Sequence, residues 1–173
     1  MTITQIITLV VAALALLVAS TYLLPRHVQV QRQATVPLSP AAVLALAGSN
    51  SGYQRFNPYR TSDPKLKVQL FGPDSGVGSG FHFESKDGKG SQTVAAVSDT
   101  AVDFEIDLGP MGHPTQRIEV SPASAGTTVV WTLHADMGMN PIGRVIGLFM
   151  DKMVGPQFET GLKNLGQTAQ VQR

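Results

Sequence analysis

The feature that most constrains the fold is an apolar helical pattern near the carboxyl terminus, in residues 140–166. Asn140 and Pro141 suit a helix start, because asparagine caps free backbone amides and proline at the first helical position needs no amide donor. Apolar side chains then recur at steps of three and four residues, which places them on one helix face. These side chains are Ile142, Val145, Ile146, Phe149, Met153, Phe158, Leu162 and Leu165. Gly155-Pro156 interrupts the pattern, so we expect a kink there or two abutting helices.

The segments before this helix predict the apolar surface on which it packs, because they alternate apolar and polar residues as strands do. In the clearest segment, Ala101 to Leu108, Asp103, Glu105 and Asp107 alternate with apolar residues, so a shift of one residue would bury three carboxylates. We expect strands at 27–36, 65–70, 77–84, 91–97, 101–108, 116–121 and 127–135, and a short helix at 39–48. Residues 50–60 are expected to form a turn and a second short helix, which Asn57-Pro58 stops.

Short turns between these strands favour an antiparallel meander with one solvated face. The terminal helix is expected to cover the apolar face. The predicted fold is therefore α+β, with a curved antiparallel sheet of about six to seven strands wrapped on a long carboxy-terminal helix. A strongly curved sheet would leave space for a ligand beneath the helix.

The amino terminus has a different character. Residues 1–25 carry no charged side chain, and residues 3–24 are dominated by Ile, Leu, Val and Ala. A run of about 20 apolar residues spans a bilayer core. We expect an uncleaved transmembrane anchor at 1–25, because no Lys or Arg precedes the run. A cleaved signal peptide and a buried core helix are the alternatives. Arg26 and Arg32 follow the span, so the positive-inside rule predicts a cytoplasmic domain at 26–173.

Composition excludes several classes of function. The net charge is +1 with few charged residues, which argues against a nucleic-acid partner. The chain contains no cysteine, so disulfides and thiolate chemistry are excluded. The four histidines are scattered, and we expect no metal site. The glycine-rich stretch at 76–80 precedes a strand rather than a helix, which favours a turn over a phosphate loop, and we expect no cofactor.

The sequence identifies no catalytic residue. His82 and His134 alternate with apolar residues, and we expect both on the sheet's solvent face, as we do Asp103, Glu105 and Asp107. Asp151 is expected on the helix surface. No serine or threonine has the glycine-flanked context of a nucleophile.

Large side chains are instead predicted to converge on the apolar interior, where they would line a ligand cavity. They are Phe56, Tyr59, Phe81, Phe83, Phe104, Trp131, Phe149 and Met153. A filled core is the alternative for each of them. Tyr59 and Trp131 each bring a polar atom that could orient a ligand.

Several stretches resemble a known superfamily, namely residues 36–43, 56–59, 72–80, 130–133 and 151–165. Together with the order of elements, they resemble the helix-grip fold of the START-like superfamily, also written SRPBCC. The chain is most similar to its bacterial polyketide cyclase/dehydrase-like proteins, some of which carry an amino-terminal membrane segment. The resemblance covers residues 28–166 and implies no shared catalytic motif.

This resemblance implies a membrane-anchored module that binds a hydrophobic small molecule or lipid between the sheet and the terminal helix. A cyclase or dehydratase acting in the same cavity is the alternative, and it would require an inward-facing proton-transfer group such as His134, Asp136 or Glu84. A third possibility is a domain that binds a protein partner at the membrane through an exposed apolar patch.

Overall fold

The computed structural model describes residues 2–86 and 88–169. Its seven strands are β1 (His27–Val36), β2 (Lys67–Phe71), β3 (Gly80–Ser85), β4 (Gly88–Val97), β5 (Ala101–Asp107), β6 (Thr115–Ala123) and β7 (Gly126–Asp136). Its helices are α1 (Ile3–Thr21), α2 (Pro40–Ala47), α3 (Asn50–Tyr53), α4 (Tyr59–Ser62), α5 (Pro141–Gly147) and α6 (Met150–Thr168), with a 3-10 turn, η1 (Gly109–Met111).

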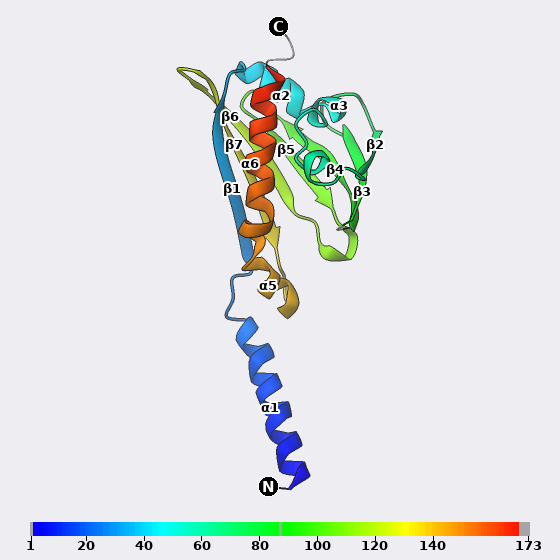
Figure 1. Cartoon of the computed structure of the whole chain (residues 1–173), viewed down its shortest axis with the longest axis vertical. Coiled ribbons are helices and arrows are strands. Elements are labelled where there is room, and N and C mark those ends of the chain that lie inside the picture. Colours follow the sequence, from blue (N-terminus) through cyan, green and yellow to red (C-terminus); the bar gives the residue numbers. More distant parts are fainter. Residues whose placement is uncertain (1, 87, 170–173) are drawn as a thin grey trace.

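The strands form one antiparallel sheet in the order β1-β7-β6-β5-β4-β3-β2. Strands β2 to β7 lie side by side in chain order and form a meander. The first strand, β1, pairs with the last, β7. The sheet curves around α6, which crosses its concave face (Figure 1). Helix α2 packs against β5 and β6, and α3 packs against β2. The predicted α+β helix-grip architecture is confirmed.

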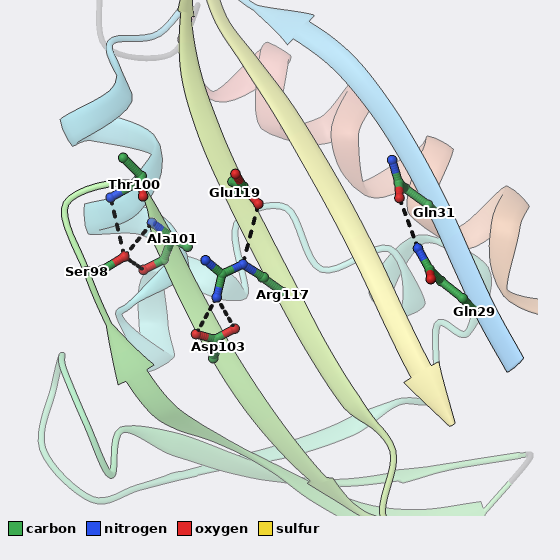
Figure 2. A network of polar contacts seen from close by, with 8 residues as sticks. All are labelled: Gln29, Gln31, Ser98, Thr100, Ala101, Asp103, Arg117 and Glu119. Atoms are coloured by element: carbon green, nitrogen blue, oxygen red, sulfur yellow. Dashed lines mark hydrogen bonds and ion pairs between the residues drawn. The ribbon is translucent and has the colours of Figure 1, made fainter. Parts of the chain in front are cut away.

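Alternation along the strands sets which side chains enter the core. On β5, Val102, Phe104 and Ile106 are buried, whereas Glu105 and Asp107 are exposed, as the sequence pattern predicts. The outer face carries its own polar pairs. Figure 2 shows Arg117 on β6 reaching the carboxylate of Asp103 on β5 at 2.8 Å. This arrangement keeps the carboxylates of β5 away from the concave interior.

The short helices follow the local capping signals. Ser39 caps α2 by accepting a hydrogen bond from the Ala42 amide at 3.2 Å, as expected for a serine followed by proline. The turn and short helix predicted to stop at Asn57-Pro58 correspond to α3 and the turn after it, and a further short helix, α4, follows the proline. The residue before a proline is disfavoured in helical geometry, so the chain turns there before α4 begins.

The break in the terminal helical stretch lies at residues 148–149, between α5 and α6, and not at Gly155-Pro156. Helix α6 continues through Pro156, although proline removes one backbone hydrogen bond. Packing on both sides of the proline holds this part of the helix in place. The chain turns instead beside Gly147, where a Cβ atom would lie 2.9 Å from Val28 Cγ2.

Helix α6 is joined to the edge strand β1 by Arg32. The Arg32 guanidinium donates to Glu159 Oε1 at 2.8 Å and to Asp151 Oδ1 at 2.8 Å. It thus joins two side chains that are about two helical turns apart. It lies over Gly155, where any Cβ atom would overlap it. These hydrogen bonds hold the pKa of Asp151 below its usual range. Asp151 is thus a surface partner of Arg32, as its helical position predicts.

Helix α1 projects from the domain (Figure 1). Nearly all of its side chains are exposed. It is therefore not a buried core helix. Within residues 2–86 and 88–169, α1 is the one helix long and apolar enough to cross a membrane. Its carboxyl end is attached to α5, because Arg144 Nη1 donates to the carbonyl oxygens of Tyr22 at 2.8 Å and Leu24 at 3.1 Å.

Candidate functional site

The candidate site is the concave interior of the sheet, beneath the second half of α6. Trp131 on β7 stacks on Phe158 of α6, with ring centroids 4.6 Å apart and planes 12° from parallel. Gly161, on the next turn of α6, allows this close approach, because a Cβ atom there would lie 2.5 Å from Trp131 Cζ3. The helix is therefore seated directly on the largest side chain of the core.

Residues 50–57 fill the remaining centre of the interior. Tyr53 lies 4.8 Å from Phe56, 5.4 Å from Phe81 and 5.7 Å from Phe104 between ring centroids. Its ring also meets the edge of Trp131. The space that the sequence predicts for a ligand is thus occupied by a cluster of the protein's own aromatic rings.

Residues 50–57 are held on the sheet by hydrogen bonds made by Asn50. Asn50 Nδ2 donates to the carbonyl oxygens of Phe71 at 3.3 Å and Pro73 at 3.2 Å. Within the described residues, the buried Gln54 Nε2 has no hydrogen-bond acceptor. A buried amide without an acceptor is unfavourable, so Gln54 Nε2 destabilises this arrangement of residues 50–57.

Two pairs of side chains supply polar atoms to this interior. Trp131 Nε1 donates to Gln116 Oε1 at 3.0 Å. The side chain of Gln92 lies by the Tyr53 hydroxyl and partly offsets the effect of burial on its pKa. Gln92 and Gln116 are both buried on the concave face. Such pairs satisfy buried polar groups and could also exchange partners with a ligand oxygen.

Proton-transfer groups are scarce in this interior. Among the described residues, the buried titratable side chains are Tyr53, Asp63 and Arg144, and Tyr53 is the one in the aromatic cluster. Burial raises the pKa of Tyr53, so it stays a neutral phenol. Asp63 lies near the β3–β4 turn, where the amide of Lys86 and then that of Lys65 lower its pKa.

The three groups that could have supported acid–base catalysis face outward. His134 is exposed, Asp136 pairs with Arg26 at 2.7 Å, and Glu84 pairs with Lys67 at 3.1 Å. Hydrogen bonding from Arg26 holds the pKa of Asp136 well below its usual range. None of these three groups reaches the concave interior.

The predicted site residues divide into two groups. Phe56, Phe81, Phe104 and Trp131 are buried together, and the half-buried Phe83 packs against them. Tyr59, Phe149 and Met153 are exposed. Tyr59 begins α4 after the turn at Pro58, and Phe149 lies in the break at 148–149. Met153 is on the outward side of the first turn of α6, whose Met150 and Val154 pack against the core.

Tyr53, Gln92, Gln116 and Phe158 are interior residues that were not predicted as site residues. For the two glutamines, the strand pattern contains the necessary signal. Gln92 shares its face with Val94, and Gln116 shares its face with Ile118, so alternation alone points both inward. Tyr53 lies in a short irregular segment, where no periodicity indicates which way a side chain points.

A separate groove of about 340 Å³ lies at the β1 edge of the sheet, between β1 and α6. Ala34, Val36 and Leu162 form its apolar part, and Glu159 and Lys163 lie along its helix side. None of the eight predicted site residues lines it. The groove is therefore distinct from the concave interior.

A curved seven-stranded antiparallel sheet gripping a carboxy-terminal helix defines the START-like, or SRPBCC, class. The chain belongs to the family described as polyketide cyclase / dehydrase and lipid transport, which matches residues 27–170. No curated protein matches the chain in sequence.

Solved structures with the same fold share little sequence with this chain. Protein Ms6760 from Mycobacterium smegmatis has a TM-score of 0.60 at 10% identity, covering 84% of this chain and 93% of that one. Ara h 8.0201 has a TM-score of 0.56 at 12% identity, covering 79% and 96%. The di-domain ARO/CYC StfQ from the steffimycin biosynthetic pathway has a TM-score of 0.56 at 9% identity, covering 80% and 49%. At these identities the likeness shows the fold alone.

Proposed function

We propose that this protein is a membrane-anchored module that binds a hydrophobic small molecule or lipid in the concave interior between the sheet and α6. The observation that carries the proposal is the chemistry of that interior. Aromatic and aliphatic side chains surround the hydrogen-bonded pair Trp131–Gln116 and the neighbouring neutral side chains of Tyr53 and Gln92. Apolar walls with a few fixed polar atoms are typical of sites that hold hydrophobic ligands.

Binding requires residues 50–57 to move, because Tyr53 and Phe56 occupy the centre of the interior. A ligand would replace their ring contacts with its own apolar surface. A ligand oxygen could also accept from the unpaired Gln54 Nε2. In this scheme residues 50–57 form a plug that a ligand displaces, and Phe81, Phe83, Phe104 and Trp131 line the space that opens.

Anchoring by α1 places this interior beside a source of hydrophobic ligands. The helix has 19 residues, and at 1.5 Å per residue it is about as long as a bilayer core is thick, roughly 30 Å. A helix of this kind at an amino terminus is also compatible with a signal sequence, which is the alternative. The basic residues that follow it favour a cytoplasmic domain.

The test is to extract the full chain in lipid nanodiscs and analyse retained small molecules by native mass spectrometry. We expect one hydrophobic molecule per domain, with a saturable change in the fluorescence of Trp131, the single tryptophan. Gln116→Leu should reduce retention, because it removes the partner of Trp131 Nε1. The control Gln29→Leu, on the exposed outer face of β1, should leave it unchanged. An empty domain with unchanged fluorescence would contradict the proposal.

A cyclase or dehydratase is the second candidate, favoured by the family description and by the fold shared with the ARO/CYC StfQ. In such an enzyme the neutral Tyr53 phenol would donate a proton to the bound substrate. Tyr53→Phe should then abolish turnover while binding persists. Equal turnover in the two proteins would remove Tyr53 from any catalytic role.

A further inference from the structure

Helix α5 has the opposite polarity from a helix on a water-facing surface. Its inward side is formed by Arg144 and Gly147, both buried. Its outward side presents Ile142, Val145 and Ile146, whose side chains are 69%, 40% and 44% exposed. A helix that borders water places polar residues outward. The outward face of α5 therefore indicates an apolar neighbour that is not part of the described chain.

The apolar surface continues from α5 onto the start of α6. We call it the α5 patch, and its exposed members are Ile142, Val145, Ile146, Leu148, Phe149 and Met153. In residues 137–150 the one charged side chain is Arg144, which is buried. A contiguous apolar surface of this kind marks a contact with a membrane or another protein.

The position of the α5 patch favours a membrane over another protein as the surface that it contacts. Arg144 donates to the carbonyl oxygens of Tyr22 and Leu24 at the carboxyl end of α1, and its guanidinium lies 5.3 Å from the centre of the Tyr22 ring. If α1 spans the bilayer, Tyr22 lies at the depth where interfacial aromatic residues gather. Figure 1 shows α5 at this end of the domain, between α1 and the sheet.

The charges next to the α5 patch fit a lipid surface. Lys152 is exposed and takes part in none of the ion pairs among the described residues. The nearby carboxylates are neutralised, because Asp151 pairs with Arg32 and Asp136 pairs with Arg26. A basic side chain beside an apolar helix face is the arrangement that binds the boundary between headgroups and acyl chains.

We propose that the α5 patch lies in the interfacial layer of the bilayer that α1 spans, so that the domain is held against the membrane at two points. This inference rests on the proposed anchoring by α1. Because Arg144 joins the end of α1 to α5, the two helices would move as one body. The α5 end of the curved sheet would then face the lipids.

Spin labels on single cysteines test this in the full chain, because the protein has no cysteine of its own. The three variants are Ile146→Cys in the α5 patch, Leu16→Cys in α1 and Val97→Cys at the far end of the sheet. Val97 is the matched control, because it is apolar and 47% exposed against 44% for Ile146. In phosphatidylcholine nanodiscs, a spin label that lies in lipid is accessible to oxygen. A spin label that lies in water is accessible to a water-soluble nickel chelate.

We expect the oxygen-to-nickel ratio at positions 146 and 16 to be several-fold higher than at position 97. A lipid-like ratio at 16 with a water-like ratio at 146 would overturn the inference while anchoring stands. Low accessibility to both reagents at 146 would also overturn it, because a protein partner or a second copy would then cover the patch. A water-like ratio at 16 would remove the anchor and, with it, this inference. Circular dichroism of each variant confirms that it is folded.

Discussion

Two regions of the carboxy-terminal helical stretch share one apolar pattern but have opposite surroundings. Phe158, Leu162 and Leu165 on the second half of α6 are buried against the sheet, whereas Ile146 and Phe149 are exposed beside the end of α1. Helical spacing of apolar residues therefore predicts that one helix face contacts an apolar surface. The spacing does not show whether that surface is the protein's own core or a lipid.

The first and largest expected effect contrasts two phenylalanines of this stretch. Phe158→Ala should lower the free energy of unfolding by about 3–5 kcal/mol, because it removes a buried ring that stacks on Trp131. Phe149→Ala should cost clearly less, because the Phe149 ring is not among the side chains packed in the core. Denaturant unfolding of the full chain in nanodiscs, followed by Trp131 fluorescence, measures both. Equal losses would mean that the two halves do not differ in their surroundings.

Two glycines of α6 give the second contrast. Gly161→Ala should cost about 1–3 kcal/mol, because the new methyl group meets the buried Trp131 ring. Gly155→Ala should cost less than about 1 kcal/mol, because the Arg32 guanidinium can move away and alanine favours the helix. Thermal unfolding of the two variants compares them directly. A larger loss for Gly155→Ala would show that Arg32, rather than Trp131, determines how α6 is seated.

The smallest expected effect is a loss of protection from amide hydrogen exchange at acidic pH. Hydrogen bonds from Arg26 and Arg32 lower the pKa values of Asp136 and Asp151, so their stabilising contribution is complete above the ordinary carboxyl pKa of about 3.9. It is lost as the pH falls through the lowered values of the folded state. Hydrogen exchange should therefore rise in α5 and the start of α6 before it rises around Phe158. Simultaneous loss in both regions would contradict this order.

Alternation in the sequence predicts most of the sheet, because strands such as β5, β6 and β7 have one solvent-facing side and one buried side. The three carboxylates of residues 103–107 make the register of β5 unambiguous, and the structure agrees. The same reasoning fails at the helix break. Gly155-Pro156 is locally unfavourable in a helix, but Arg32 and Phe158 pack on either side of it and α6 continues. Tertiary packing of this kind is not visible in a local pattern.

The candidate site could be predicted in part. Phe81, Phe104 and Trp131 lie on strands whose periodicity points them inward, and they are found in the interior. Tyr53 could not be placed, because α3 is too short to show a period. Phe149 has the same helical spacing as the buried residues, and its exposure depends on where α6 begins. The turn between α5 and α6 thus decides which side chains of the stretch reach the interior.

Quenching of tryptophan by brominated lipids tests the central contrast most directly. In a Trp131→Phe background, which removes the native tryptophan, Phe149→Trp would place a probe in the α5 patch and Val97→Trp would place one at the opposite end of the sheet. Both positions are exposed, at 52% and 47%. We predict strong quenching at position 149 and little at position 97. Equal, weak quenching at both positions would show that the exposed half of the stretch faces water and not the bilayer.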